Sequence, residues 1–124
     1  MKKINKLRVG IVGCGRISVI YKNVFIECGD KIEVVFAMDK VLERAKKFAE
    51  DFKRCGYSNN YQDILSQDLD VVHICTPHYL HKTQVIQALK AGINVLTEKP
   101  LAITLDDADK MIEVANKSDK KFGV

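Results

Sequence analysis

Three small residues near the start of the chain have the spacing of a turn that binds a dinucleotide. Gly13, Gly15 and Ser18 form the pattern GxGxxS, between an apolar run and a helical pattern. In such a turn the first glycine allows a tight bend, the second lets a pyrophosphate approach the backbone, and the third position must be small so that the helix packs against the strand. The alternative is that the glycines only form a turn, because this motif alone is weakly specific.

The helix that starts after this turn is expected to hold the phosphates. Backbone N–H groups at a helix N-terminus point outward and favour negative charge, so the amides of Gly15 to Ile17 are suitable donors. The predicted cofactor-binding residues of this turn are Gly13, Cys14, Gly15, Arg16 and Ile17.

Asp39 lies 21 residues after Ser18, at the end of a β-branched run. A carboxylate at this place can accept hydrogen bonds from the adenosine ribose and would repel a 2′-phosphate, which favours NAD. NADP is the alternative, because Lys40 and Arg44 are near enough in sequence to partner a phosphate. Asp39 is also a suitable N-cap for the next helix, and the two roles need not exclude each other.

Strands and helices alternate along the chain in a way that would position these residues. Apolar runs predict strands over residues 7–13, 32–38, 57–61, 70–75, 93–97 and 122–124. Helical periodicity predicts helices over residues 16–28, 41–52, 61–66, 80–92 and 104–115. Thr104 and Asp107 have the spacing of a capping box. The alternation predicts an α/β protein with a Rossmann-type, doubly wound, three-layer parallel sheet, and residues 1–124 as one dinucleotide-binding domain.

Composition excludes several other classes of protein. With 47% hydrophobic and 29% charged residues the chain has a soluble globular composition, and no apolar run approaches the roughly 18 residues of a membrane span. The start, MKKINKL, lacks the apolar segment of a signal peptide, so the cytoplasm is expected. The net charge of +4 comes from lysines scattered among acids, which is typical of solvated helices and not of a nucleic-acid surface. The four cysteines lack CxxC spacing, which predicts reduced thiols and no metal site.

Two loops later in the chain carry a resemblance to a known family. The strand at 70–75 is followed by Thr76-Pro77-His78-Tyr79-Leu80-His81, and the strand at 93–97 by Glu98-Lys99-Pro100. In these motifs and their order the chain resembles the glucose-fructose oxidoreductase and inositol dehydrogenase family, over essentially its whole length. A methyltransferase shares the Gly-rich loop and the acidic residue but does not explain these two loops.

The resemblance implies roles for residues in both loops. Thr76 and Pro77 would shape the loop beneath the cofactor, with His81 in the same wall, although a histidine hydrogen-bonded to backbone is the alternative for His81. Glu98 and Lys99 would lie at the nicotinamide end, with the lysine near the reacting hydroxyl of the substrate. A solvated loop lysine is the alternative for Lys99.

Lys99 suits the chemistry that the resemblance implies. Oxidation of an alcohol by hydride transfer requires that the hydroxyl lose a proton, and a lysine in a partly dry cleft beside a cationic nicotinamide gives up its own proton more readily. It could then act as a base or as a hydrogen-bond donor to the oxygen.

The resemblance also implies a part of the protein that lies outside this chain. Family members have a second α/β domain that forms the substrate pocket and usually the subunit interface, and that supplies a catalytic Asp and His. The expected function is therefore that of the cofactor-binding domain of an NAD(P)-dependent oxidoreductase of a sugar, cyclitol or related polyol, homo-oligomeric when the second domain is present. The isolated chain is expected to bind cofactor without efficient turnover. A non-catalytic nucleotide-binding or sensor module is the alternative.

Overall fold

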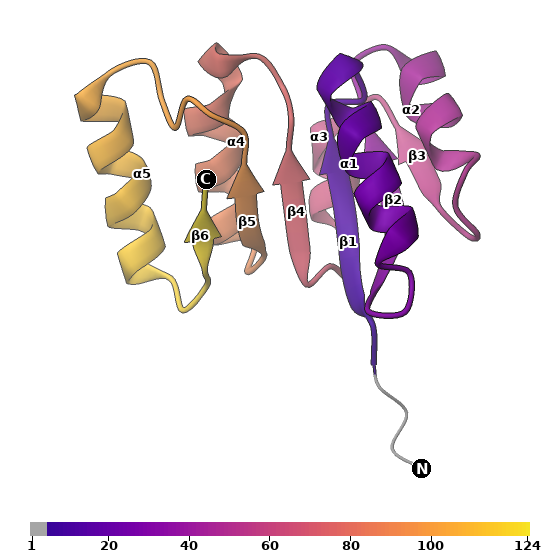
Figure 1. Ribbon diagram of the computed structural model, residues 1–124. Helices are drawn as coiled ribbons and strands as arrows, with labels where there is room; N and C mark the ends of the chain where they lie inside the picture. The colour runs from indigo at the N-terminus through magenta and orange to yellow at the C-terminus, as the bar shows by residue number, and fades with distance from the viewer. Residues whose placement is uncertain (1–4) are drawn as a thin grey trace.

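Six parallel strands form one sheet in the computed structural model, which describes residues 5–124 (Figure 1). Residues 1–4, the first part of the MKKINKL segment for which no signal peptide is predicted, lie outside the described residues. The strands are β1 (Leu7–Val12), β2 (Ile32–Met38), β3 (Gly56–Ser58), β4 (Val71–Ile74), β5 (Asn94–Thr97) and β6 (Phe122–Gly123). Their order is β3-β2-β1-β4-β5-β6, which is the order of the doubly wound dinucleotide-binding fold. The predicted fold class is confirmed.

Five helices connect the strands and cover both faces of the sheet. They are α1 (Arg16–Glu27), α2 (Leu42–Ala49), α3 (Tyr61–Leu65), α4 (His78–Lys90) and α5 (Leu105–Lys117). From the centre of the sheet, β1, β2 and β3 follow one another toward one edge. The chain then returns to the centre, and β4, β5 and β6 follow one another toward the other edge. Right-handed crossovers therefore place α1 and α2 on one face and α4 and α5 on the opposite face. Figure 1 shows α1 on the near face of the sheet and α4 behind it.

Each face of the sheet has its own apolar core. Neighbouring residues of β1 point to opposite faces, so Val12 and Ile11 belong to different clusters. The larger cluster joins β1, β2, β4 and β5 to the three later helices through Ile64, Leu89 and Met111. The smaller cluster joins Val34 and Ala37 of β2 to Phe48 and Ala49 of α2. This arrangement gives the three layers that the sequence predicts.

Much of the apolar stripe of α1 is exposed. Apolar residues recur along this helix at helical spacing, but Ile17, Ile20 and Val24 are 38%, 60% and 45% exposed. The buried residue of this helix is Ser18, and its half-buried aromatic residues are Tyr21 and Phe25. Helical periodicity shows which residues share a stripe, but the position of the helix over the sheet decides how much of that stripe is covered.

The helix bounds differ from the predicted ones by one to three residues, and one predicted cap forms only in part. The second helix ends at Ala49 and not at Phe52, whose ring stacks on Phe48 at 5.5 Å between centroids. Only half of the predicted capping box forms. Thr104 accepts a hydrogen bond from the Asp107 amide at 3.1 Å, but the carboxylate of Asp107 pairs with Lys82 on α4 at 3.1 Å.

Candidate cofactor site

The turn between β1 and α1 requires glycine at its first position. Gly13 has a φ of +91°, and a Cβ added there would lie 2.8 Å from the carbonyl carbon and oxygen of Cys75 and 3.0 Å from the amide nitrogen of Thr76. The Gly13 amide donates to the Met38 carbonyl at 2.8 Å. The turn is therefore packed between the ends of β2 and β4, and a side chain has no room in it.

The N-terminus of α1 is open. Gly15 is the N-cap, without a side-chain cap hydrogen bond, and the first turn of the helix contains no acidic residue. A Cβ added at Gly15 would have no atom within 4 Å. The buried Ser18 hydroxyl donates to the Gly15 carbonyl at 2.5 Å, which ties the helix start to the turn. This local geometry fits a phosphate at the amides of Arg16 and Ile17, because positive charge from the helix dipole is available there and no side chain blocks it.

Asp39 connects this turn to the next helix. One carboxylate oxygen accepts from the Cys14 amide at 2.8 Å and the other from the Val41 amide at 2.8 Å. The N-cap of α2 is Val41, so the predicted N-cap role of Asp39 is wrong: its bond to the backbone lies just ahead of the helix. A carboxylate has about four acceptor sites, so Asp39 can still accept hydrogen bonds from ribose hydroxyls.

The thiol beside Asp39 is chemically quiet. Burial, together with the Asp39 carboxylate, raises the pKa of Cys14 to about 12, and burial raises the pKa of Cys55 and Cys75 to about 12 as well. All four cysteines are free thiols, in line with the predicted absence of disulfides. Among residues 5–124, no group of three or more His, Cys, Asp or Glu side chains could hold a metal ion.

The loop after β4 is held by two side chains of α4. Pro77 is the N-cap of this helix, and the Thr76 hydroxyl donates to the buried Gln84 side chain at 2.5 Å. His81 is fully buried, with Nδ1 2.9 Å from the Pro100 carbonyl and Nε2 2.8 Å from the Thr76 carbonyl. The structure thus shows the backbone-bonded arrangement that was the alternative for His81. Any effect of this ring on a cofactor passes through the two loops that it joins.

The loop after β5 lies beside the loop after β4. The Glu98 amide donates to the Ile74 carbonyl at 3.0 Å, and the Glu98 carboxylate accepts a hydrogen bond from the Tyr21 hydroxyl. Lys99 is exposed, and its peptide bond to Pro100 is cis. A pocket of about 270 Å³ is lined by Ile17, Cys75, Thr76, His78, Glu98 and Lys99.

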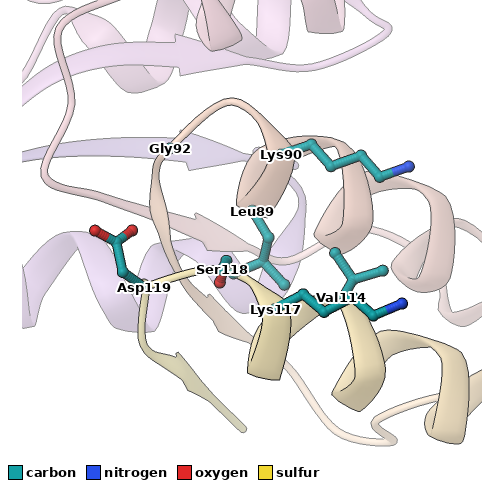
Figure 2. Close-up of a pocket in the computed structure, with 7 residues that line it drawn as sticks. All are labelled: Leu89, Lys90, Gly92, Val114, Lys117, Ser118 and Asp119. Carbon is teal, nitrogen blue, oxygen red and sulfur yellow. The ribbon is translucent and has the colours of Figure 1, made fainter.

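This pocket lies where the fold binds ligands. In open α/β sheets, ligands bind outside the carboxyl ends of the strands where the strand order reverses, which here is between β1 and β4. A larger cavity of about 630 Å³ lies at the opposite end of the strands, next to the turns that precede β5 and β6. Figure 2 shows that its lining side chains come from the C-terminal ends of α4 and α5 and from the turn before β6. None of the predicted site residues lines that cavity.

The structure places most of the predicted site residues at the carboxyl ends of the strands. The phosphate turn, Asp39 and the two later loops all follow the carboxyl ends of strands. The sequence analysis assigns no role to Tyr21 or to Gln84, whose side chains bond to Glu98 and to Thr76. Neither residue belongs to a recognisable motif, and a tyrosine within an aliphatic stripe was the one available signal.

Comparisons with known proteins identify the family of the chain. Residues 7–124 match the oxidoreductase family with an NAD-binding Rossmann fold. Myo-inositol 2-dehydrogenase of Thermotoga maritima is 32% identical over 117 residues, which are 91% of this chain and 34% of that protein. The chain spans about a third of the length of the curated relatives it matches. No helix among residues 5–124 combines the length and the apolar character needed to cross a membrane.

Two solved structures show which cofactors similar proteins bind. The WlbA dehydrogenase of Chromobacterium violaceum, solved with NADH and UDP-GlcNAcA, has a TM-score of 0.91 and 33% identity, and covers 96% of this chain and 35% of that one. KijD10, a 3-ketoreductase of Actinomadura kijaniata solved with NADP, has a TM-score of 0.82 and 32% identity, and covers 91% of this chain and 35% of that one. The chain belongs to the glucose-fructose oxidoreductase and inositol dehydrogenase family and has its NAD-binding Rossmann fold.

Proposed function

We propose that this chain is the cofactor-binding domain of an NAD(P)-dependent oxidoreductase that transfers a hydride to or from a sugar, a cyclitol or a related polyol. The observation that carries this proposal is the pocket between the loops after β4 and β5, which begins at Ile17 on the phosphate-binding end of α1. A dinucleotide whose pyrophosphate lies on α1 and whose ribose meets Asp39 extends its other half toward this pocket.

Each part of the site has a separate task in this proposal. The amides of Arg16 and Ile17 bind the pyrophosphate, and Asp39 selects a free ribose diol, which favours NAD over NADP. Thr76 and Pro77 form the floor of the pocket. When bound, the nicotinamide supplies the carbon that gives or accepts the hydride. Lys99, at the rim of the pocket, is the residue that holds or moves the proton of the substrate hydroxyl.

The substrate class is proposed from the relatives. One relative is named as an inositol dehydrogenase, one as a 3-ketoreductase, and one was solved with a nucleotide-linked sugar. The reaction that these have in common is the interconversion of a secondary alcohol and a ketone on a ring. We place the protein in the cytoplasm and expect a homo-oligomer in the complete protein, with no nucleic-acid or membrane partner.

We also propose that the 124-residue chain binds cofactor but turns over substrate slowly. The exposure of Lys99 supports this part of the proposal. Hydride transfer requires the reacting carbons to be held roughly 3 to 3.5 Å apart, and a lysine on an open rim does not hold a substrate in that way. The same exposure favours the second candidate, a nucleotide-binding module without chemistry.

Calorimetric titration and steady-state assays test the proposal together. We expect NAD to bind more tightly than NADP, and little or no turnover with myo-inositol, D-glucose or a UDP-sugar. If any turnover is measured, Lys99→Ala should abolish it and change NAD affinity by less than about twofold, since the lysine acts on the substrate. Failure of either nucleotide to bind contradicts the cofactor assignment, and robust turnover contradicts the claim that this chain alone is slow.

A further inference from the structure

A tyrosine of α1 contacts Glu98, one of the residues that line the pocket between the loops after β4 and β5. The hydroxyl of the half-buried Tyr21 donates a hydrogen bond to the Glu98 carboxylate, across 77 residues of sequence. Glu98 lines the pocket between the loops after β4 and β5 and precedes Lys99. The contact therefore joins the phosphate-binding helix to the loop at the other end of the site.

The ring of Tyr21 is held in place by its neighbours. It meets the His73 ring edge-on, with 4.2 Å between centroids and an interplanar angle of 66°, and the Phe25 ring lies 6.5 Å away. His73 lies on β4 and is 2% exposed, and burial lowers its pKa to about 4. The histidine ring is therefore neutral at ordinary pH and packs against the tyrosine as an aromatic group, without competing for the Glu98 carboxylate.

The proposed function gives the carboxylate that Tyr21 contacts a place relative to the cofactor. Arg16 and Ile17 at the N-terminus of α1 would hold the pyrophosphate, and Asp39 at the end of β2 would hold the adenosine ribose. The other half of the dinucleotide would then extend toward the loops after β4 and β5, where Glu98 lies. A carboxylate there attracts the cationic ring of NAD⁺ and has no comparable attraction for the neutral ring of NADH.

We propose that Tyr21 is a positioning residue that fixes the Glu98 carboxylate, and that this pair makes the site prefer the oxidised over the reduced cofactor. The inference rests on the proposed function, because it needs the dinucleotide to lie across the carboxyl ends of the strands. Beyond that function, Tyr21 has a role that it exerts through Glu98. The pair controls the preference for the oxidised over the reduced cofactor.

Titration of NAD⁺ and NADH into the 124-residue chain, three single variants and one double variant tests the inference. Tyr21→Phe removes only the hydroxyl, and Glu98→Gln keeps the shape of the side chain but removes its charge. We expect Tyr21→Phe to weaken NAD⁺ binding about 3- to 10-fold, as the loss of a hydrogen bond to a charged group predicts, and to change NADH binding less than about twofold. Tyr57→Phe is the matched control, because it removes a hydroxyl from β3 at 44% exposure and should change neither affinity.

The double variant decides whether Tyr21 acts through Glu98. In the Glu98→Gln background, Tyr21→Phe should cause no further loss, because the charge that the hydroxyl positions is already absent. Additive losses, equal weakening of NAD⁺ and NADH, or no effect of Tyr21→Phe would each overturn the inference and leave the proposed function standing. If the unmodified chain binds neither NAD⁺ nor NADH, the proposed function fails and the inference fails with it.

Discussion

Gly13 and Gly15 are separated by one residue, yet the structure assigns them different reasons for lacking a side chain. At Gly13 the positive φ and the backbone of Cys75 leave no space, so the requirement comes from folding. At Gly15 the space is open and φ is −84°, a value that any residue adopts. We propose that the requirement at Gly15 comes from a pyrophosphate that approaches the backbone.

A pair of alanine variants separates the two reasons. Gly13→Ala should lower the free energy of unfolding by about 2–4 kcal/mol, because it combines a close contact with a strained backbone. Gly15→Ala should change it by less than about 0.5 kcal/mol and should weaken NAD binding at least tenfold. Urea denaturation and NAD titration of both variants measure the two effects. A stable Gly13→Ala or a tightly binding Gly15→Ala would contradict this division.

His73 should make the stability of the chain depend on pH in the mildly acidic range. Burial lowers its pKa in the folded chain from 6.5 to about 4, so between these values the unfolded chain binds a proton that the folded chain does not. Stability is therefore lost as the pH falls through this window, by up to roughly 3 kcal/mol.

Urea denaturation near pH 7 and near pH 4.5 measures this loss, with His73→Leu as the comparison. The Nδ1 atom of His73 has no hydrogen-bond partner among residues 5–124, so leucine gives up no bond to those residues at that atom. The variant should lose less stability on acidification than the unmodified chain. Equal losses would show that other groups, mainly carboxylates, cause the pH dependence.

At the scale of elements, His81 joins the start of α4 to the loop after β5. His81→Ala removes both contacts to backbone carbonyls and leaves a cavity, so it should destabilise the chain by about 3 kcal/mol. His81→Gln can still donate to one carbonyl and should cost less. Thermal and urea unfolding measure the stabilities of the two variants. Tyr79→Ala is the control, because Tyr79 lies on the same helix and is 64% exposed. If His81→Gln is as damaging as His81→Ala, packing and not hydrogen bonding explains the role of the ring.

The elements themselves were largely predictable, because local patterns determine them. Strand β2 has the predicted bounds, and β1, β4 and β5 differ by a residue at one end or both. The errors occur where tertiary contacts decide the outcome. Asp107 pairs with Lys82 on another helix instead of completing its own cap, and Ile20 stays exposed because no described element covers that side of α1.

At the scale of the molecule, the strand order explains why much of the site could be predicted. Every turn that follows a parallel strand lies at the same end of the sheet. Topology alone therefore places the Gly13 turn, Asp39 and the loops at Thr76 and Glu98 at that end. The contact between Tyr21 and Glu98 could not be predicted in this way. It depends on the direction of two side chains that are far apart in sequence, and no spacing rule connects them.

The cysteine in the phosphate turn has a consequence for oxidative damage. Oxidation by peroxide and alkylation both proceed through the thiolate, and burial, together with the Asp39 carboxylate, raises the pKa of Cys14 to about 12. Burial raises the pKa of Cys75, whose backbone lies against the same turn, to about 12 as well. We therefore expect peroxide and alkylating reagents to react slowly with the thiols on both sides of Gly13.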